Sequence, residues 1–76
     1  MPVNRYSFQN IFGINPTTND IYPLFNTRIN GMYYPQYISI HRGLGFGGID
    51  IYRLIGRSFS GTWDSENKIL TIVGIL

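Results

Sequence analysis

The stretch RSFSGTWDSENKILTIVGIL, residues 57–76, decides the fold that we predict for this chain. Its first part alternates, with Phe59, Gly61 and Trp63 on one face of an extended strand and small polar side chains on the other. The letters DSEN at 64–67 are typical of a turn. The stretch therefore predicts two strands, 57–64 and 68–76, that are joined by this turn.

The last strand is apolar on both of its predicted faces. One face would carry Ile69, Val73 and Ile75. The opposite face would carry Leu70, Ile72 and Leu76. A strand that is buried on both faces belongs between two layers. The second layer is then barrel closure, a short helix or another subunit, and closure and a subunit interface stand as equal alternatives.

A second hairpin is predicted at LFNTRINGMYY, residues 24–34. Asn30-Gly31 favours a type I′ turn, which needs a positive φ at both central positions. The turn would place Arg28 and Tyr33 together on the solvent side. The core face would consist of Phe25, Thr27, Ile29, Met32 and Tyr34.

The remaining segments complete the predicted sheet. Residues 3–10 suggest an edge strand, 14–23 a broad turn, and 37–42 a strand with Ile38 and Ile40 inward. Residues 50–55 suggest a short helical turn that Asp50 caps and Gly56 ends. Its buried side would carry Ile51, Leu54 and Ile55. The same letters also alternate as a strand, but that strand would bury Arg53.

Composition agrees with a single all-β domain over residues 1–76. The chain has no alanine, 16% aromatic residues, nine glycines and four prolines. Alanine favours helices, whereas aromatic and β-branched residues suit strands. We expect about five antiparallel strands in a curved sheet or a partly open SH3-like barrel, with the one short helical turn near 50–55.

The glycines of GLGFGG, residues 43–48, have the spacing of a dinucleotide-binding fingerprint. That fingerprint works only in a βαβ unit of about 30 residues within a parallel sheet. A chain of 76 residues that is predicted to be mostly hairpins leaves no room for one. We therefore expect no dinucleotide and no other cofactor. Binding of an anion by the glycine-rich backbone beside Arg42 remains an alternative interpretation.

Catalytic and metal chemistry have few candidate residues. The chain has no cysteine, one histidine and four carboxylates. No nucleophile or orienting carboxylate can be assigned to His41, and Asp64 and Glu66 are explained as turn residues. The sequence therefore predicts a protein that is not an enzyme and that has no metal site.

Association with a protein, including a second copy of the chain, is the leading functional prediction. Charged residues make up only 13% of the chain, and tyrosine is typical of interfaces. The candidate interface residues are Tyr33, Tyr34, Tyr37, Leu70, Ile72 and Leu76. The alternative is a nucleic-acid or other polyanion-binding module that uses Arg42, Arg53 and Arg57, against which the net charge of only +2 counts.

No targeting or membrane signal is expected. Residues 1–10 lack the apolar core of a secretory signal, and the apolar run at 69–76 is too short to span a bilayer. Cytoplasm is the default localisation.

Overall fold

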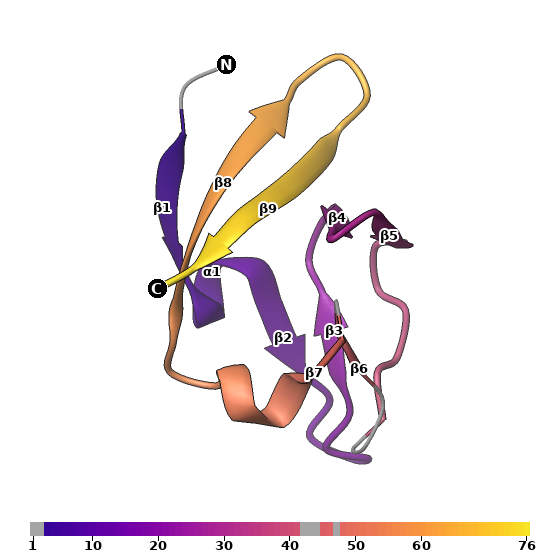
Figure 1. The fold of residues 1–76 in the computed structure, drawn as a ribbon. Coiled ribbons are helices and arrows are strands. Elements are labelled where there is room, and N and C mark those ends of the chain that lie inside the picture. Colours follow the sequence, from indigo (N-terminus) through magenta and orange to yellow (C-terminus); the bar gives the residue numbers. More distant parts are fainter. Residues whose placement is uncertain (1–2, 42–44, 47) are drawn as a thin grey trace.

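A computed structural model describes residues 3–41, 45–46 and 48–76 of the chain (Figure 1). The elements, in chain order, are β1 (Asn4–Ser7), α1 (Phe8–Ile11), β2 (Phe12–Ile14), β3 (Ile21–Pro23), β4 (Asn26–Ile29), β5 (Met32–Tyr34), β6 (Gly45–Phe46), β7 (Ile49–Asp50), η1 (the 3₁₀ helix Ile51–Leu54), β8 (Ser58–Asp64) and β9 (Ile69–Ile75).

The main sheet has five strands in the order β1-β8-β9-β4-β5, and β2–β3 and β6–β7 form two short ribbons. The predicted small β-rich domain is thus confirmed. One detail of the prediction is wrong: β4 and β9 pair in parallel, whereas the other neighbours in this sheet are antiparallel. A parallel pair needs a long crossover, which the segment between β5 and β8 supplies.

The core lies between the main sheet and a layer made of α1, β2, β3 and η1. In Figure 1 this layer lies toward the lower end of the sheet, and the β8–β9 turn projects away from it. Phe12 links the layers, with its ring centroid 4.8 Å from that of Phe8 and 6.0 Å from that of Phe59. The core residues are Phe8, Ile11, Phe12, Ile21, Ile29, Ile40, Ile51, Leu54, Phe59, Leu70 and Ile72.

The predicted 24–34 hairpin forms with the predicted register. Asn30 and Gly31 both have positive φ, of 50° and 77°, and Arg28 lies opposite Tyr33. Thr27 is fully buried, and its hydroxyl is satisfied there because Oγ1 donates a 2.7 Å hydrogen bond to the Phe25 carbonyl. The core face of this hairpin contains fewer residues than predicted. Met32 and Phe25 are 49% and 36% exposed, so neither is a core residue.

The first strand is shorter than predicted and ends at Ser7. The prediction missed α1, in which Phe8 and Ile11 are buried. Their spacing of three residues is typical of a helix face, and Phe12 continues it. This single turn carries the chain from the sheet edge into the second layer.

The broad turn predicted at 14–23 closes the β2–β3 hairpin. The Asn15 side-chain carbonyl accepts hydrogen bonds from the backbone N–H groups of Thr17 and Thr18, at 2.9 and 3.4 Å. Asn15 therefore bonds local backbone, as the sequence suggests.

The strand predicted at 37–42 is wrong over its described part, residues 37–41. Tyr37, two residues after Pro35, has a φ of +66°, which interrupts an extended chain. Only Ile40 reaches the core, through a single bridge to Ile21, and Ile38 is 43% exposed.

The predicted helical turn is present as η1. The Asp50 side chain accepts the Tyr52 N–H at 3.1 Å, and Gly56 has a φ of +82°. A 3₁₀ helix has three residues per turn, so Ile51 and Leu54 share one buried side. Ile55 is rotated off that side and is 47% exposed, which corrects its predicted burial.

Strands β8 and β9 form the predicted hairpin, but a β-bulge changes the faces of β9. Gly61 pairs with Ile72 and Ser60 with Gly74, so Val73 is the extra residue. Beyond the bulge the alternation is shifted by one residue. Ile75 therefore joins Leu70 and Ile72 on the core side, which corrects the predicted faces.

Candidate binding surface

The sheet face opposite the core carries the candidate functional site, and we call it the outer face. Its members alternate along each strand with the core-side residues. Ser60 and Gly74 show this pairing directly, because a Cβ at Gly74 would lie 2.7 Å from the Ser60 hydroxyl. The outer face consists of Arg5, Ser7, Asn26, Arg28, Tyr33, Ser58, Ser60, Thr62, Asp64, Ile69, Thr71, Val73, Gly74 and Leu76.

Apolar side chains on this face reach the solvent along β9. Val73 is 58% exposed, and Leu76, just beyond the strand, is 51% exposed. Two other candidates from this strand, Leu70 and Ile72, are only 1% and 5% exposed and belong to the core of the chain. The second apolar face of β9 is therefore open to solvent, and the described chain places no layer over it.

The predicted tyrosine cluster is divided between separate places. Tyr33 is 48% exposed on the outer face, whereas the Tyr34 hydroxyl donates a 3.0 Å hydrogen bond to the Gly45 carbonyl. Tyr37 packs edge-on against Tyr22, with ring centroids 6.1 Å apart. Only Tyr33 shares a surface with the exposed residues of β9.

The structure describes two of the three arginines that are predicted to bind a polyanion. Arg42 lies outside the described residues, and Arg53 is exposed on η1. Arg57 donates from Nε to the Leu76 carbonyl at 2.9 Å. Polyanion binding by these residues stays a prediction. Arg5 and Arg28, which are not among the predicted polyanion-binding residues, lie on the outer face.

His41 has a carboxylate partner that sequence reasoning missed. Its Nδ1 lies 3.0 Å from the Asp20 carboxylate. The two residues are far apart in sequence, and the bridge between Ile21 and Ile40 makes them neighbours. The pair therefore joins the residue before β3 to the residue after Ile40.

The described part of the glycine-rich segment forms a hairpin. Gly45 pairs with Asp50 and Phe46 with Ile49, and a single 3₁₀ turn follows. The anion nest beside Arg42 lies outside the described residues. Within the described ranges, no group of three or more histidine or acidic side chains is placed to hold a metal ion.

Asp64 organises the β8–β9 turn. Its carboxylate accepts from the Asn67 side chain at 2.8 Å and from the backbone N–H groups of Glu66 and Asn67 at 3.0 and 3.2 Å. The Asn67 side-chain hydrogen bond, and then the backbone ones, hold the pKa of Asp64 below its ordinary value. The predicted turn role of Asp64 is thus confirmed.

This lowered pKa makes the turn sensitive to acid. Asp64 stabilises the fold fully above about pH 4, and this contribution is lost as the pH falls through its lowered folded-state pKa. Asp64→Asn should therefore lower Tm at pH 6, and the difference from wild type should shrink at pH 2. Glu66→Gln removes a charge from the same turn and serves as the matched control, with a smaller expected effect at pH 6. Equal melting of wild type and Asp64→Asn at pH 6 would contradict this role.

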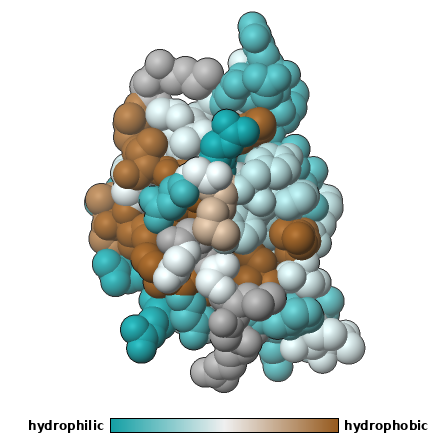
Figure 2. All heavy atoms as spheres, turned by 45° about the vertical axis from the view of Figure 1, so that its right-hand side comes forward, coloured by the Kyte–Doolittle hydropathy of each residue, from teal (hydrophilic) through white to brown (hydrophobic). Residues whose placement is uncertain are grey.

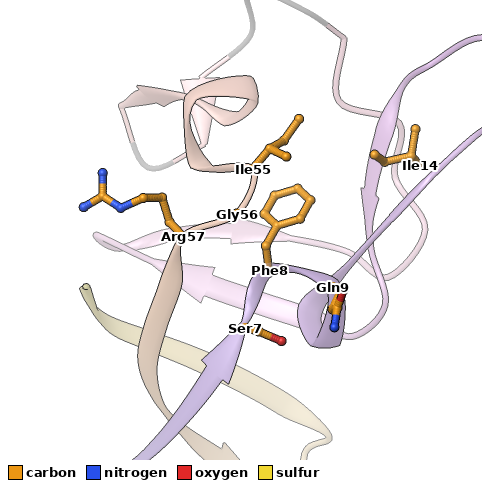
Figure 3. A pocket seen from close by; sticks show the side chains of 7 residues that line it. All are labelled: Ser7, Phe8, Gln9, Ile14, Ile55, Gly56 and Arg57. Carbon is orange, nitrogen blue, oxygen red and sulfur yellow. The ribbon is translucent and has the colours of Figure 1, made fainter.

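A groove of about 470 Å³ opens beside the end of β1 (Figure 3). The Phe8 ring points toward Ile55, and Ile14 lies across the opening from both (Figure 3). Ile14 and Ile55 are each 47% exposed. Figure 2 shows hydrophobic atoms reaching the surface in several clusters, while the β8–β9 turn at the top is hydrophilic.

Comparison with family models, with curated proteins and with solved structures finds no match to this chain. In the part of the chain that the structure describes, no helix has the length and apolar character to cross a membrane.

Proposed function

We propose that the protein is a non-catalytic binding and assembly module, and that it associates with a second copy of itself through the outer face. The exposed apolar side of β9 carries this proposal. This strand is the third of five, so its outer side lies within the sheet rather than at an edge. Val73 and Leu76, at 58% and 51% exposed, lose solvent contact if another layer covers them.

The polar residues of the outer face suit an interface. Arginine and tyrosine are enriched at interfaces, and lysine and glutamate are depleted. The face offers Arg28 and Tyr33 side by side, with serine and threonine hydroxyls on the neighbouring strands. It has no lysine or glutamate, and its one carboxylate, Asp64, is bonded within a turn. Two such faces related by a twofold axis form a sandwich of two sheets.

The size of the sheet sets the expected affinity. Five strands that are about 4.8 Å apart and on average about 17 Å long cover a projected area of roughly 400 Å². A standard interface takes about 800 Å² of accessible surface from each partner. The proposed interface is therefore small, and we expect a dimer that dissociates on dilution.

Light scattering after size-exclusion chromatography tests the proposal over a series of concentrations. Wild type should shift from monomer to dimer as the concentration rises. Val73→Lys should remain monomeric because the lysine charge cannot be buried in a sheet-to-sheet interface. Val73→Thr keeps the β-branched shape and is the matched control, which should still dimerise.

Two outcomes would contradict the outer-face interface. One is a wild-type protein that is monomeric at the highest concentration, and the other is a Val73→Lys variant that dimerises as wild type does. Absorbance at 260 nm is read in the same runs. A monomer with excess absorbance at 260 nm that disappears in high salt would favour the polyanion-binding alternative instead.

A further inference from the structure

Strand β1 is an edge strand whose free backbone groups can be assigned from its register. The Phe8 N–H donates to the Arg57 carbonyl at 3.0 Å, which continues the β1–β8 ladder. Hydrogen-bonded and non-hydrogen-bonded pairs alternate along an antiparallel ladder. Arg5 and Ser7 therefore occupy non-hydrogen-bonded positions, opposite Ser60 and Ser58. Their N–H groups point away from β8, toward the open edge.

The same edge ends at the apolar groove. Ser7 is the last residue of β1 and also lines the groove, together with Phe8 and Gln9 of the following turn (Figure 3). An extended chain that paired with Arg5 and Ser7 would arrive beside Ile14 and Ile55. Main-chain pairing and a side-chain pocket are the two parts of peptide recognition by strand addition.

Charge indicates which peptides suit this place. Residues 3–14 and 55–60 contain two arginines, Arg5 and Arg57, and no carboxylate. Arg5 is exposed, and its Nη2 lies 3.5 Å from the Ser58 hydroxyl, so its charge is not neutralised there. An acidic chain is attracted to this edge, and a basic chain is repelled.

We propose that the β1 edge binds an extended acidic peptide segment, which adds a strand beside Arg5 and Ser7 and places an apolar side chain in the groove of Phe8, Ile14 and Ile55. The site uses the open backbone edge of β1 and the groove, whereas the proposed dimer interface rests on Val73 and Leu76 along β9, the third strand of the sheet counted from this edge. The edge is only four residues long, and Arg5 discourages pairing with other basic edges, including a second copy of itself.

Ser7→Pro is the sharpest test of strand addition. Ser7 has a φ of −82°, which proline can adopt, and the residue before it is extended as proline requires. The substitution removes one outward N–H without changing the charge. Ser7→Ala is the matched control, because it loses the hydroxyl that donates to the Asn10 side chain but keeps the N–H.

The probe is a labelled peptide, Glu-Leu-Glu-Val-Glu-Leu, and binding is followed by fluorescence anisotropy. Wild type and Ser7→Ala should bind it alike, and Ser7→Pro should bind about tenfold more weakly. In the wild type, the Arg5 and Ser7 amides should exchange with solvent quickly and become protected when peptide is added. Absence of binding to wild type, or equal binding by Ser7→Pro and Ser7→Ala, would overturn the proposal.

Arg5→Glu provides a second test that does not depend on the proline variant folding. The wild type should prefer the glutamate peptide over the matched peptide Lys-Leu-Lys-Val-Lys-Leu, and Arg5→Glu should weaken or reverse that preference. An unchanged preference would overturn the charge argument. Val73→Lys should bind the glutamate peptide as wild type does, so failure of the dimer leaves this test intact.

Discussion

Ile72→Lys is expected to abolish the folded state. Ile72 is 5% exposed and lies on β9 between Gly61 of β8 and Ile29 of β4. A lysine there would bury an unpaired ammonium group, which costs several kcal/mol, and would also lose the apolar contacts of isoleucine. A chain of 76 residues has a total stability of about 4 to 11 kcal/mol. Far-UV circular dichroism at 25 °C should show loss of the strand signal.

The adjacent substitution Val73→Lys is the control for this prediction. Val73 is 58% exposed at the bulge, so a lysine there stays in water, and the variant should keep the spectrum of wild type and melt within a few degrees of it. Two neighbouring residues of similar hydropathy thus give opposite results. A cooperative, unchanged melt for Ile72→Lys, or unfolding of both variants, would show that the faces of β9 are assigned wrongly.

The bulge also shows where sequence reasoning is limited. Along β8, polar and apolar residues alternate, so the sequence predicts both the strand and its faces. Along β9 nearly every residue is apolar, and a pattern without contrast gives no sign of a shift in register. The predicted faces of Ile75 and Leu76 are therefore wrong, because pairing with β8 sets the position of the bulge at Val73.

Local sequence signals predicted the turns. The features that these signals missed depend on contacts between residues that are distant in the sequence. Asn30-Gly31 and Asp50 form the predicted turn and cap because these residues act on nearby backbone. Ile38 fits an alternating pattern, yet it is 43% exposed because the positive φ of Tyr37 interrupts the extended backbone just before it. Among the described residues 37–41, Ile40 alone is buried in the core, opposite Ile21.

The candidate surface was partly predictable from sequence. Tyr33 and Leu76 were selected from the residues and are exposed on the outer face. Arg28 could not be placed beside β9, because the parallel β4–β9 pair joins strands that are distant in the sequence. The pairing of His41 with Asp20 was missed for the same reason.

Gly61→Ala is the other substitution with a large expected effect. A Cβ at Gly61 would lie 2.8 Å from the Thr71 carbonyl oxygen and 3.5 Å from Cε2 of the Tyr6 ring. Gly61 is buried in β8, between β1 and β9, so the backbone of β9 would have to move. Such overpacking costs about 1 to 3 kcal/mol. At about 4 to 8 °C for each kcal/mol, Tm should fall by at least several degrees.

Gly74→Ala separates this clash from the simple presence of a methyl group. A Cβ at Gly74 meets an atom at a similar distance, 2.7 Å, but that atom is the Ser60 hydroxyl, which can rotate away. Replacing glycine also reduces the freedom of the unfolded chain, which favours folding by about 0.4 to 1 kcal/mol. Urea denaturation should therefore show a lower midpoint for Gly61→Ala and a nearly unchanged or higher one for Gly74→Ala. Equal losses would mean that any side chain at these positions is destabilising, whatever lies opposite. The different results expected here follow from the rigidity of the atom that each new methyl group meets.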